Sequence, residues 1–192
     1  MPDTTRPLAE GPHAVIRPYT YADGPEFTAR ARESRELHSP WLFPPTTDKA
    51  YQAYAGALIE GRGRVGFLVC ERDGERGGER GRGRGATGGA IAGFVNINNI
   101  VEGAFLCGAL GYGAFAHAAG RGLMSEGVGL VTRYAFDVLK LHRLEINVQP
   151  GNTASIALAR RCGYRLEGFS PDFLHIDGAW RDHERWALTA TE

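Results

Sequence analysis

The chain has 192 residues, 43% of them hydrophobic, with 22 Lys+Arg against 22 Asp+Glu. This length suits one domain with a single core and is too short for two. The balanced charge excludes a global field that would draw the protein to nucleic acid or to an anionic membrane. No apolar signal core opens the chain and no stretch approaches the ~20 apolar residues of a membrane span, so we expect a cytoplasmic protein.

The cysteines and histidines predict neither disulfides nor a metal site. Cys70, Cys107 and Cys162 are scattered singly, without a CxxC pair, and we interpret them as reduced, mostly buried thiols. The six histidines form no cluster with the cysteines at metal-ligand spacing. We therefore predict no metal.

The chain before residue 65 predicts one strand and two helices. Asp23 suits a helix N-cap with Pro25 in the first turn, and Thr47 or Asp48 suits a second N-cap. The expected elements are a flexible tail over residues 1–12, a strand over 13–19, a helix to about Glu36 and a helix to about Glu60.

The segment between the two helices, His38 to Thr46, contains three prolines and cannot be regular. Trp41 and Phe43 lie within it. One interpretation is a loop that lays aromatic surface along a substrate pocket. The other is that both rings fill the core, and the sequence leaves the two open.

Two strands flank a segment of unusual composition. Val65–Glu71 and Ala90–Asn98 are rich in β-branched and aromatic residues, whereas residues 73–89 are almost wholly Gly, Arg and acidic residues. A segment with so little apolar surface cannot offset its ordering entropy, which predicts a flexible insert between the strands. RNA binding by its arginines is disfavoured, because acidic residues offset them and no aromatic is interleaved for stacking.

The second half alternates strands and helices. Gly163 suits a left-handed helix cap, and Asp177-Gly178 is a strong hairpin turn. The whole order predicts an α/β (α+β) domain whose mixed, mostly antiparallel central sheet carries helices on both faces. The expected strands cover residues 104–112, 142–149, 164–169, 173–176 and 180–188, and the expected helices cover 122–139 and 152–162.

The segment from Leu110 to Glu126 places glycines between a strand and a helix. Gly120 and Gly122 let the backbone approach a ligand closely, and the N–H groups of the helix's first turn favour an anion such as a pyrophosphate. The chain has neither a P-loop lysine motif nor an early GxGxxG. Nucleotide hydrolysis and dinucleotide binding therefore lose support.

This loop resembles the acetyl-CoA pyrophosphate loop of the GCN5-related N-acetyltransferases, the GNAT superfamily. The family's motif for this loop is roughly [QR]-x-x-G-x-[GA]. Residues 117–122 match it except at the first position, where His117 replaces Gln or Arg. Further segments are similar to the RimJ/RimL branch, and the likeness spans residues 13–188 apart from the insert. These segments are Leu110-Gly111-Tyr112, Gly122-Leu123-Met124, Asn152 with Ser155, and Gly163 to Gly168.

The resemblance implies a GNAT-like fold and direct transfer of an acetyl group from acetyl-CoA to a primary amine in a ternary complex. The branch implies a protein N-terminus, as of a ribosomal protein, as acceptor. One alternative is a small amine acceptor, such as an antibiotic or amino acid. Another is a non-catalytic acyl-CoA-binding protein. The resemblance also implies a possible homodimer, since homodimers are common in the family. The implied cofactor-binding residues are Ala114, Phe115, His117, Gly120, Arg121, Gly122, Leu123, Met124, Asn152 and Ser155.

Acetyl transfer to an amine also needs a general base. By resemblance Asp172 is the favoured carboxylate, and Glu145 is a second candidate because strand alternation places it opposite Leu144 and Ile146. Glu145 is also expected, with Trp41 and Phe43, among the substrate-binding residues.

Three further residues have possible roles in the reaction. The resemblance implies that Ser155 protonates the leaving thiolate. Asn152 is expected to bind pantetheine or the acceptor, to cap its helix, or to do both. Cys107 could carry the acetyl group covalently, but the sequence places no base beside it, which favours direct transfer.

Overall fold

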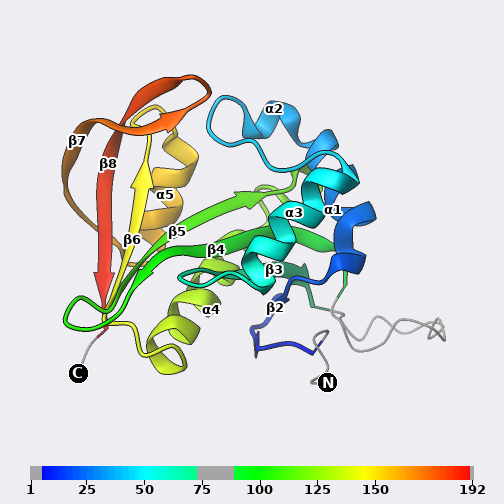
Figure 1. Cartoon of the computed structure of the whole chain (residues 1–192), viewed down its shortest axis with the longest axis horizontal. Coiled ribbons are helices and arrows are strands. Elements are labelled where there is room, and N and C mark those ends of the chain that lie inside the picture. The colour runs from blue at the N-terminus through cyan, green and yellow to red at the C-terminus, as the bar shows by residue number, and fades with distance from the viewer. Residues whose placement is uncertain (1–5, 73–88, 191–192) are drawn as a thin grey trace.

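A computed structural model describes residues 6–72 and 89–190 (Figure 1). Within these residues eight strands form one sheet in the order β1-β2-β3-β4-β5-β6-β8-β7. Only β5 and β6 pair in parallel, so the predicted mixed, mostly antiparallel sheet is confirmed. The strands are β1 (Ala9–Glu10), β2 (Ala14–Pro18), β3 (Val65–Glu71), β4 (Ile91–Val101), β5 (Cys107–Ala114), β6 (Arg143–Val148), β7 (Arg165–Ile176) and β8 (Ala179–Thr189).

Helices cover both faces of the sheet, as predicted (Figure 1). On one face α1 and α3 bury an aromatic cluster that includes Phe27, Tyr51 and Phe115. On the other face α4 and α5 bury a larger aliphatic core. The helices are α1 (Gly24–Glu33), α2 (Arg35–His38), α3 (Asp48–Ile59), α4 (Leu123–Asp137) and α5 (Thr153–Arg161), with short 3-10 turns η1 (Tyr21–Asp23) and η2 (Ala116–Ala118).

Helix α4 docks on the sheet through an apolar stripe repeated at helical spacing. Leu123, Val128 and Val131 are buried in the aliphatic core, and each such side chain contributes about 1.5–3 kcal/mol by leaving water. Gly127 allows the close approach, because a β-carbon there would lie 2.6 Å from a methyl group of Val69 on β3. The N-terminus of α4 is thereby fixed beside the end of β5.

The helix expected from Asp23 to about Glu36 is divided at Ser34. The Ser34 hydroxyl donates to the Arg30 carbonyl at 2.6 Å and accepts from the backbone N–H of Ala116 at 2.8 Å. This tertiary contact holds Ser34 away from helical geometry, so α2 follows as a separate turn. The prediction that His38 begins an irregular loop was wrong, since His38 ends α2.

Two strand boundaries also differ from the prediction. The strand expected over 104–112 is β5 at Cys107–Ala114, because Gly103 and Leu106 adopt positive φ in the turn that precedes it. The two strands expected over 164–169 and 173–176 are one strand, β7. Its pairing with β8 shifts between Ser170 and Leu174, around a positive φ at Asp172.

The expected N-terminal tail overlaps the sheet. Ala9 and Glu10 pair with Ile16 and Val15 of β2, so the tail predicted over 1–12 is too long, and residues 1–5 lie outside the described residues. Most of the insert predicted over 73–89 also lies outside them, at 73–88.

The structure also bears on the state of the cysteines and on membrane-spanning helices. The cysteines are free, with Cys70 and Cys107 buried and Cys162 partly buried, as expected. Among the described helices, none combines the length and hydropathy that crossing a bilayer requires.

Candidate active site

The sheet splits where its two parallel strands diverge. Pairing between β5 and β6 runs from Cys107↔Arg143 to Leu110↔Ile146 and then stops. Beyond this point β5 continues to Ala114, paired only with β4, while the chain after β6 turns into α5. Residues 111–114 therefore offer an open backbone edge towards α5.

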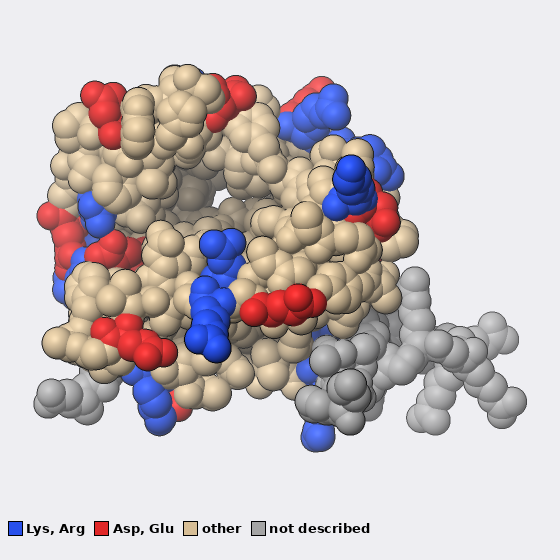
Figure 2. Space-filling model, in the orientation of Figure 1, with Lys and Arg blue, Asp and Glu red and all other residues tan. Residues whose placement is uncertain are grey.

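Two cavities meet at this split. The helix-side cavity, of about 370 Å³, lies between the end of β5, the start of α5 and the α2 region. The strand-side cavity, of about 460 Å³, lies over β4, β5, β6, β7 and β8. Figure 2 shows a hollow between the β7–β8 side and the α1–α2 side, bordered mostly by uncharged residues. The residues that line both cavities are Trp41, Leu42, Tyr112, Asn152 and Ser155.

A pair of hydroxyl groups lies where the cavities meet. Tyr112 Oη and Ser155 Oγ are 2.7 Å apart, and Tyr112 also donates to the Ser155 carbonyl at 3.3 Å. Burial raises the pKa of Tyr112 to about 12, so this phenol keeps its proton at neutral pH. Asn152 Oδ1 accepts from the Ser155 N–H at 3.1 Å, which confirms that Asn152 caps α5 while also lining both cavities.

The glycine loop before α4 is open to a ligand. Gly120 and Gly122 have φ of +73° and +80°, a region that strains other residues, and a β-carbon on either would meet nothing within 4 Å. Gly122 is the N-cap and has no side chain to occupy the first-turn N–H groups. A bare helix N-terminus of this kind fits a pyrophosphate.

The two charged or titratable side chains of the loop turn towards β3. Arg121 binds both carboxylate oxygens of Glu71, at 2.6 and 3.1 Å, and the hydrogen bond from Arg121 lowers the pKa of Glu71. His117 Nε2 lies 4.0 Å from the same carboxylate. Both ring nitrogens of His117 are buried and have no hydrogen-bond partner among residues 6–72 and 89–190, and burial lowers the pKa of His117. An uncharged ring with unmet hydrogen-bonding atoms thus lies beside the loop.

Four of the residues expected to bind the cofactor separate into two groups. Ala114 and Met124 line the helix-side cavity, and the Ala114 carbonyl accepts from His38 Nε2 at 2.7 Å. The ring of Phe115 is fully buried against Phe27, with ring centroids 5.2 Å apart. The Phe115 side chain therefore belongs to the core, as does that of Leu123.

The two aromatic residues expected to wall the pocket differ in placement. Trp41 lines both cavities and lies against Gly151, where a β-carbon would be 3.0 Å from Trp41 Cη2. Phe43 is 59% exposed and lines neither cavity. The loop thus brings one ring, and not two, to the split.

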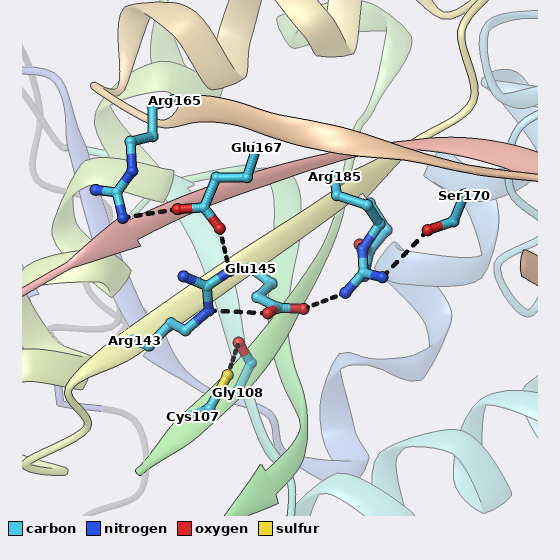
Figure 3. Close-up of polar contacts among 9 residues, drawn as sticks. Cys107, Gly108, Arg143, Glu145, Arg165, Glu167, Ser170 and Arg185 are labelled. Atoms are coloured by element: carbon cyan, nitrogen blue, oxygen red, sulfur yellow. Dashed lines mark hydrogen bonds and ion pairs between the residues drawn. The ribbon is translucent and has the colours of Figure 1, made fainter. Parts of the chain in front are cut away.

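Glu145 lines the strand-side cavity at the centre of an ion-pair network (Figure 3). Arg143 Nε lies 2.9 Å from one of its oxygens and Arg185 Nη2 lies 2.8 Å from the other. Burial favours the neutral acid, but the hydrogen bonds from both arginines outweigh it and lower the pKa of Glu145. A carboxylate held in this way is a weak base. Glu167 extends the network by pairing with Arg143 and Arg165.

Asp172, the carboxylate expected to act as base, lies outside both cavities. It is exposed on the irregular part of β7, and its backbone N–H donates to the Asp182 side chain at 2.9 Å. It lies where β7 runs four residues from Ser170 to Leu174 against two from His183 to Arg181 on β8, so that part of β7 bulges away from β8, and Asp172 has a φ of +47°.

Sequence reasoning missed a cavity residue on β8. His183 is 2% exposed and lines the strand-side cavity. Its position depends on the pairing of β8 with β6, between residues far apart in the chain, so no local motif marks it. The alternation of side chains along a predicted β8 was the only available signal.

An open mixed sheet split between two parallel strands, with a glycine loop opening a helix at the split, defines an N-acetyltransferase type of fold. The family described as Acetyltransferase (GNAT) domain matches residues 13–165, most of the chain. The chain belongs to this family.

Individual relatives agree with this assignment. The chain is 39% identical over 102 residues to the [Ribosomal protein uS5]-alanine N-acetyltransferase of Escherichia coli, which covers 53% of each protein, so the match spans about half the length of that relative. Mycobacterium smegmatis RimJ in complex with CoA-disulfide is 25% identical, with a TM-score of 0.77 over 92% of this chain and 82% of that one. The ribosomal-protein-S5-alanine acetyltransferase of Vibrio fischeri shares the fold, at 23% identity and a TM-score of 0.77, over 94% of this chain and 95% of that one.

Proposed function

We propose that this protein transfers the acetyl group of acetyl-CoA to the N-terminal amine of a protein, by direct transfer in a ternary complex. The observation that carries the proposal is the pair of cavities that meet at Tyr112 and Ser155. Direct transfer requires two substrates to reach one thioester carbonyl from separate sides. Two cavities with a shared wall provide such access.

Acetyl-CoA suits the helix-side cavity. Its pyrophosphate would lie on Gly120, Gly122 and the first turn of α4. Its pantetheine arm would run along the open edge of β5 at Ala114, which brings the thioester to Tyr112. The similarity to RimJ, whose structure holds CoA-disulfide, supports this placement.

The strand-side cavity suits a peptide better than a polycation. Its polar lining is rich in side-chain amides, which pair with peptide N–H and C=O groups. Its one carboxylate, Glu145, is already paired with two arginines, so no free negative charge is left to attract a polyamine or an aminoglycoside. The similarity to an enzyme that acetylates ribosomal protein uS5 favours an acceptor of that kind. The amides are those of Asn98, Asn99, Asn147, Gln149 and Asn152.

The hydroxyl pair suits the departure of CoA. The neutral amine attacks the thioester carbonyl, the N–C bond forms and the C–S bond breaks. The leaving thiolate takes a proton from Ser155 Oγ, and Tyr112, 2.7 Å away, replaces that proton. Because both hydroxyls are in place, a non-catalytic binding role is not favoured.

The test is an acetylation assay with acetyl-CoA and a panel of amines. The panel holds a peptide with the N-terminus of ribosomal protein uS5, the same peptide with a blocked N-terminus and one internal lysine, spermidine and an aminoglycoside. We expect acetylation of the free N-terminal peptide alone, detected by mass spectrometry. Turnover of only the polyamine or the aminoglycoside would contradict the acceptor, and acetyl-CoA binding without any turnover would contradict the enzyme.

A further inference from the structure

Neither carboxylate expected from the sequence is placed to remove a proton from the acceptor. Asp172 lies outside the cavities, and Glu145 is held by two arginines. We propose that His183 is the general base that accepts the proton of the acceptor amine. This inference rests on the proposed function and adds the identity of the base.

His183 lines the same strand-side cavity as the hydroxyl pair. Pairing between β6 and β8 runs to Val148↔Glu184, so His183 lies one residue beyond the last pair. Pairing between β5 and β6 ends at Leu110↔Ile146, so Tyr112 lies two residues beyond the last pair on that side. Glu145, in contrast, lies within the paired part of both strand pairs. His183 is thus the histidine of this cavity lining, at the end of the sheet where the strands part.

The surroundings of the imidazole fix which nitrogen is free. Nδ1 lies 2.8 Å from the Arg181 carbonyl, and because a carbonyl only accepts, Nδ1 carries the proton. In the neutral ring Nε2 then holds a lone pair. Within the described chain Nε2 has no hydrogen-bond partner. His183 lines the strand-side cavity, and its ring lies edge-on to that of Phe173, another lining residue, with ring centroids 5.9 Å apart.

Burial keeps this ring uncharged. It lowers the pKa of His183 and outweighs the Arg181 carbonyl and Asp182, which raise that pKa, while Arg185 lowers it further. On the adjacent strands, Glu145 of β6 is neutralised by its arginines and Asp172 of β7 is exposed. At neutral pH the imidazole is in its basic form, as a general base requires.

The protons balance across the reaction. The amine nitrogen attacks the acetyl carbonyl and becomes positively charged. Nε2 of His183 takes one proton from that nitrogen, directly or through one water, as the C–S bond breaks. The thiolate takes one proton from the Ser155–Tyr112 pair. His183 then releases its proton to solvent, and solvent restores the hydroxyl pair.

The test uses His183→Asn, whose side-chain amide retains a donor for the Arg181 carbonyl but offers no base. We expect kcat to fall by about 100-fold or more, with the affinity for acetyl-CoA unchanged. In the wild type, kcat/KM should fall as the pH drops through a pKa below the ordinary histidine value of about 6.5. The variant should lose this limb and keep the limb of the acceptor amine, whose pKa is about 7.7–8.0.

Two controls separate a structural effect from loss of the base. His175→Asn, on β7 and outside the cavity lining, should retain wild-type activity. His183→Gly should bind acetyl-CoA and regain activity when imidazole is added, which decides the matter even where the Asn variant folds poorly. A folded His183→Gly that binds acetyl-CoA without rescue, or His183→Asn within about threefold of wild type, would overturn the inference. Failure of the wild type on every amine would instead overturn the proposed function.

Discussion

The two sides of the split sheet differ in whether backbone or side chains form the surface that faces a ligand. On the helix side, the surface expected to hold CoA includes much backbone: the open edge of β5, two glycines at positive φ and the first turn of α4. On the strand side, the cavity is lined by side chains from β4, β6, β7 and β8. The backbone elements of the helix side come from one contiguous stretch of chain, whereas the strand-side lining is assembled by strand pairing.

This difference separates what the two sides can recognise. A backbone surface with free N–H groups accepts any ligand that brings a pyrophosphate and an extended arm, and it changes little when side chains change. A surface of amides and one paired carboxylate changes with each substitution. Cofactor choice is therefore fixed by the fold, and acceptor choice by individual residues.

The largest expected effect breaks the backbone side. Gly120→Glu combined with Gly122→Glu should weaken acetyl-CoA binding by at least about 100-fold, because each change places a carboxylate at the pyrophosphate position and strains a positive φ. Isothermal titration calorimetry measures the loss.

A matched double variant isolates the role of the loop. Gly103→Glu with Gly178→Glu introduces the same charges at two other glycines of positive φ, +74° and +75°, where a β-carbon also meets nothing. The strain is similar, but neither position lies in the loop that precedes α4. Equal loss of affinity in both double variants would show that strain, and not the anion site, explains the result.

The next effect concerns the hydroxyls where the two sides meet. Tyr112→Phe and Ser155→Ala should each lower kcat by about 10- to 100-fold and leave acetyl-CoA affinity within about twofold, since the hydroxyls act on the leaving thiolate. The double variant should lose little more, because the two act as a unit. Steady-state kinetics measures all three, and fully additive losses would contradict the relay.

A smaller effect tests the loop that joins the two sides. Trp41→Ala should raise KM for both substrates by about tenfold, because this ring lines both cavities. Phe43→Ala, in the same loop but exposed, should stay within about twofold. A larger effect of Phe43→Ala than of Trp41→Ala would mean that the loop rearranges when substrates bind.

The smallest effect concerns stability on the side-chain side. Glu145→Gln should reduce the free energy of unfolding by about 1–2 kcal/mol, because it removes the negative charge that two partly buried arginines share. Since the folded pKa of Glu145 is lowered, its contribution is present above the unfolded pKa of about 4.3 and is lost as the pH falls through the folded value.

Urea unfolding at several pH values tests this sign. The difference between wild type and variant should shrink as the pH drops below 4.3. Glu36→Gln, at an exposed position without an ion pair in the described chain, is the matched control and should differ from wild type by less than about 0.5 kcal/mol. A difference that grows towards acid pH would contradict the proposed role of the network.

The contrast between the two sides also explains what was readable from the sequence. The glycine loop, Asn152 and Ser155 form local motifs, so the sequence could single them out as candidates alongside the mixed sheet. Phe115 was expected by resemblance to bind the cofactor beside Ala114, but successive residues of an extended segment face opposite sides, and its ring enters the core. A local motif thus indicated which backbone segment lies at the site, but not the direction in which each side chain points.

The acceptor side needed information that is not local. Asp172 was favoured as base because of its neighbours in the chain, yet the irregular register of β7 turns it outward. His183 reaches the cavity only because β8 pairs with β6 in one register. Pairing between strands about 35 residues apart depends on global packing, which no short motif encodes.

A crystal structure with a bisubstrate conjugate, CoA joined through an acetyl bridge to the N-terminal amine of a peptide, tests the central claim most directly. The account predicts the pyrophosphate on Gly120 and Gly122, the bridge beside Tyr112 and Ser155, and the peptide in the strand-side cavity near His183. A structure in which the peptide extends from the bridge into the helix-side cavity, alongside CoA, would contradict the account.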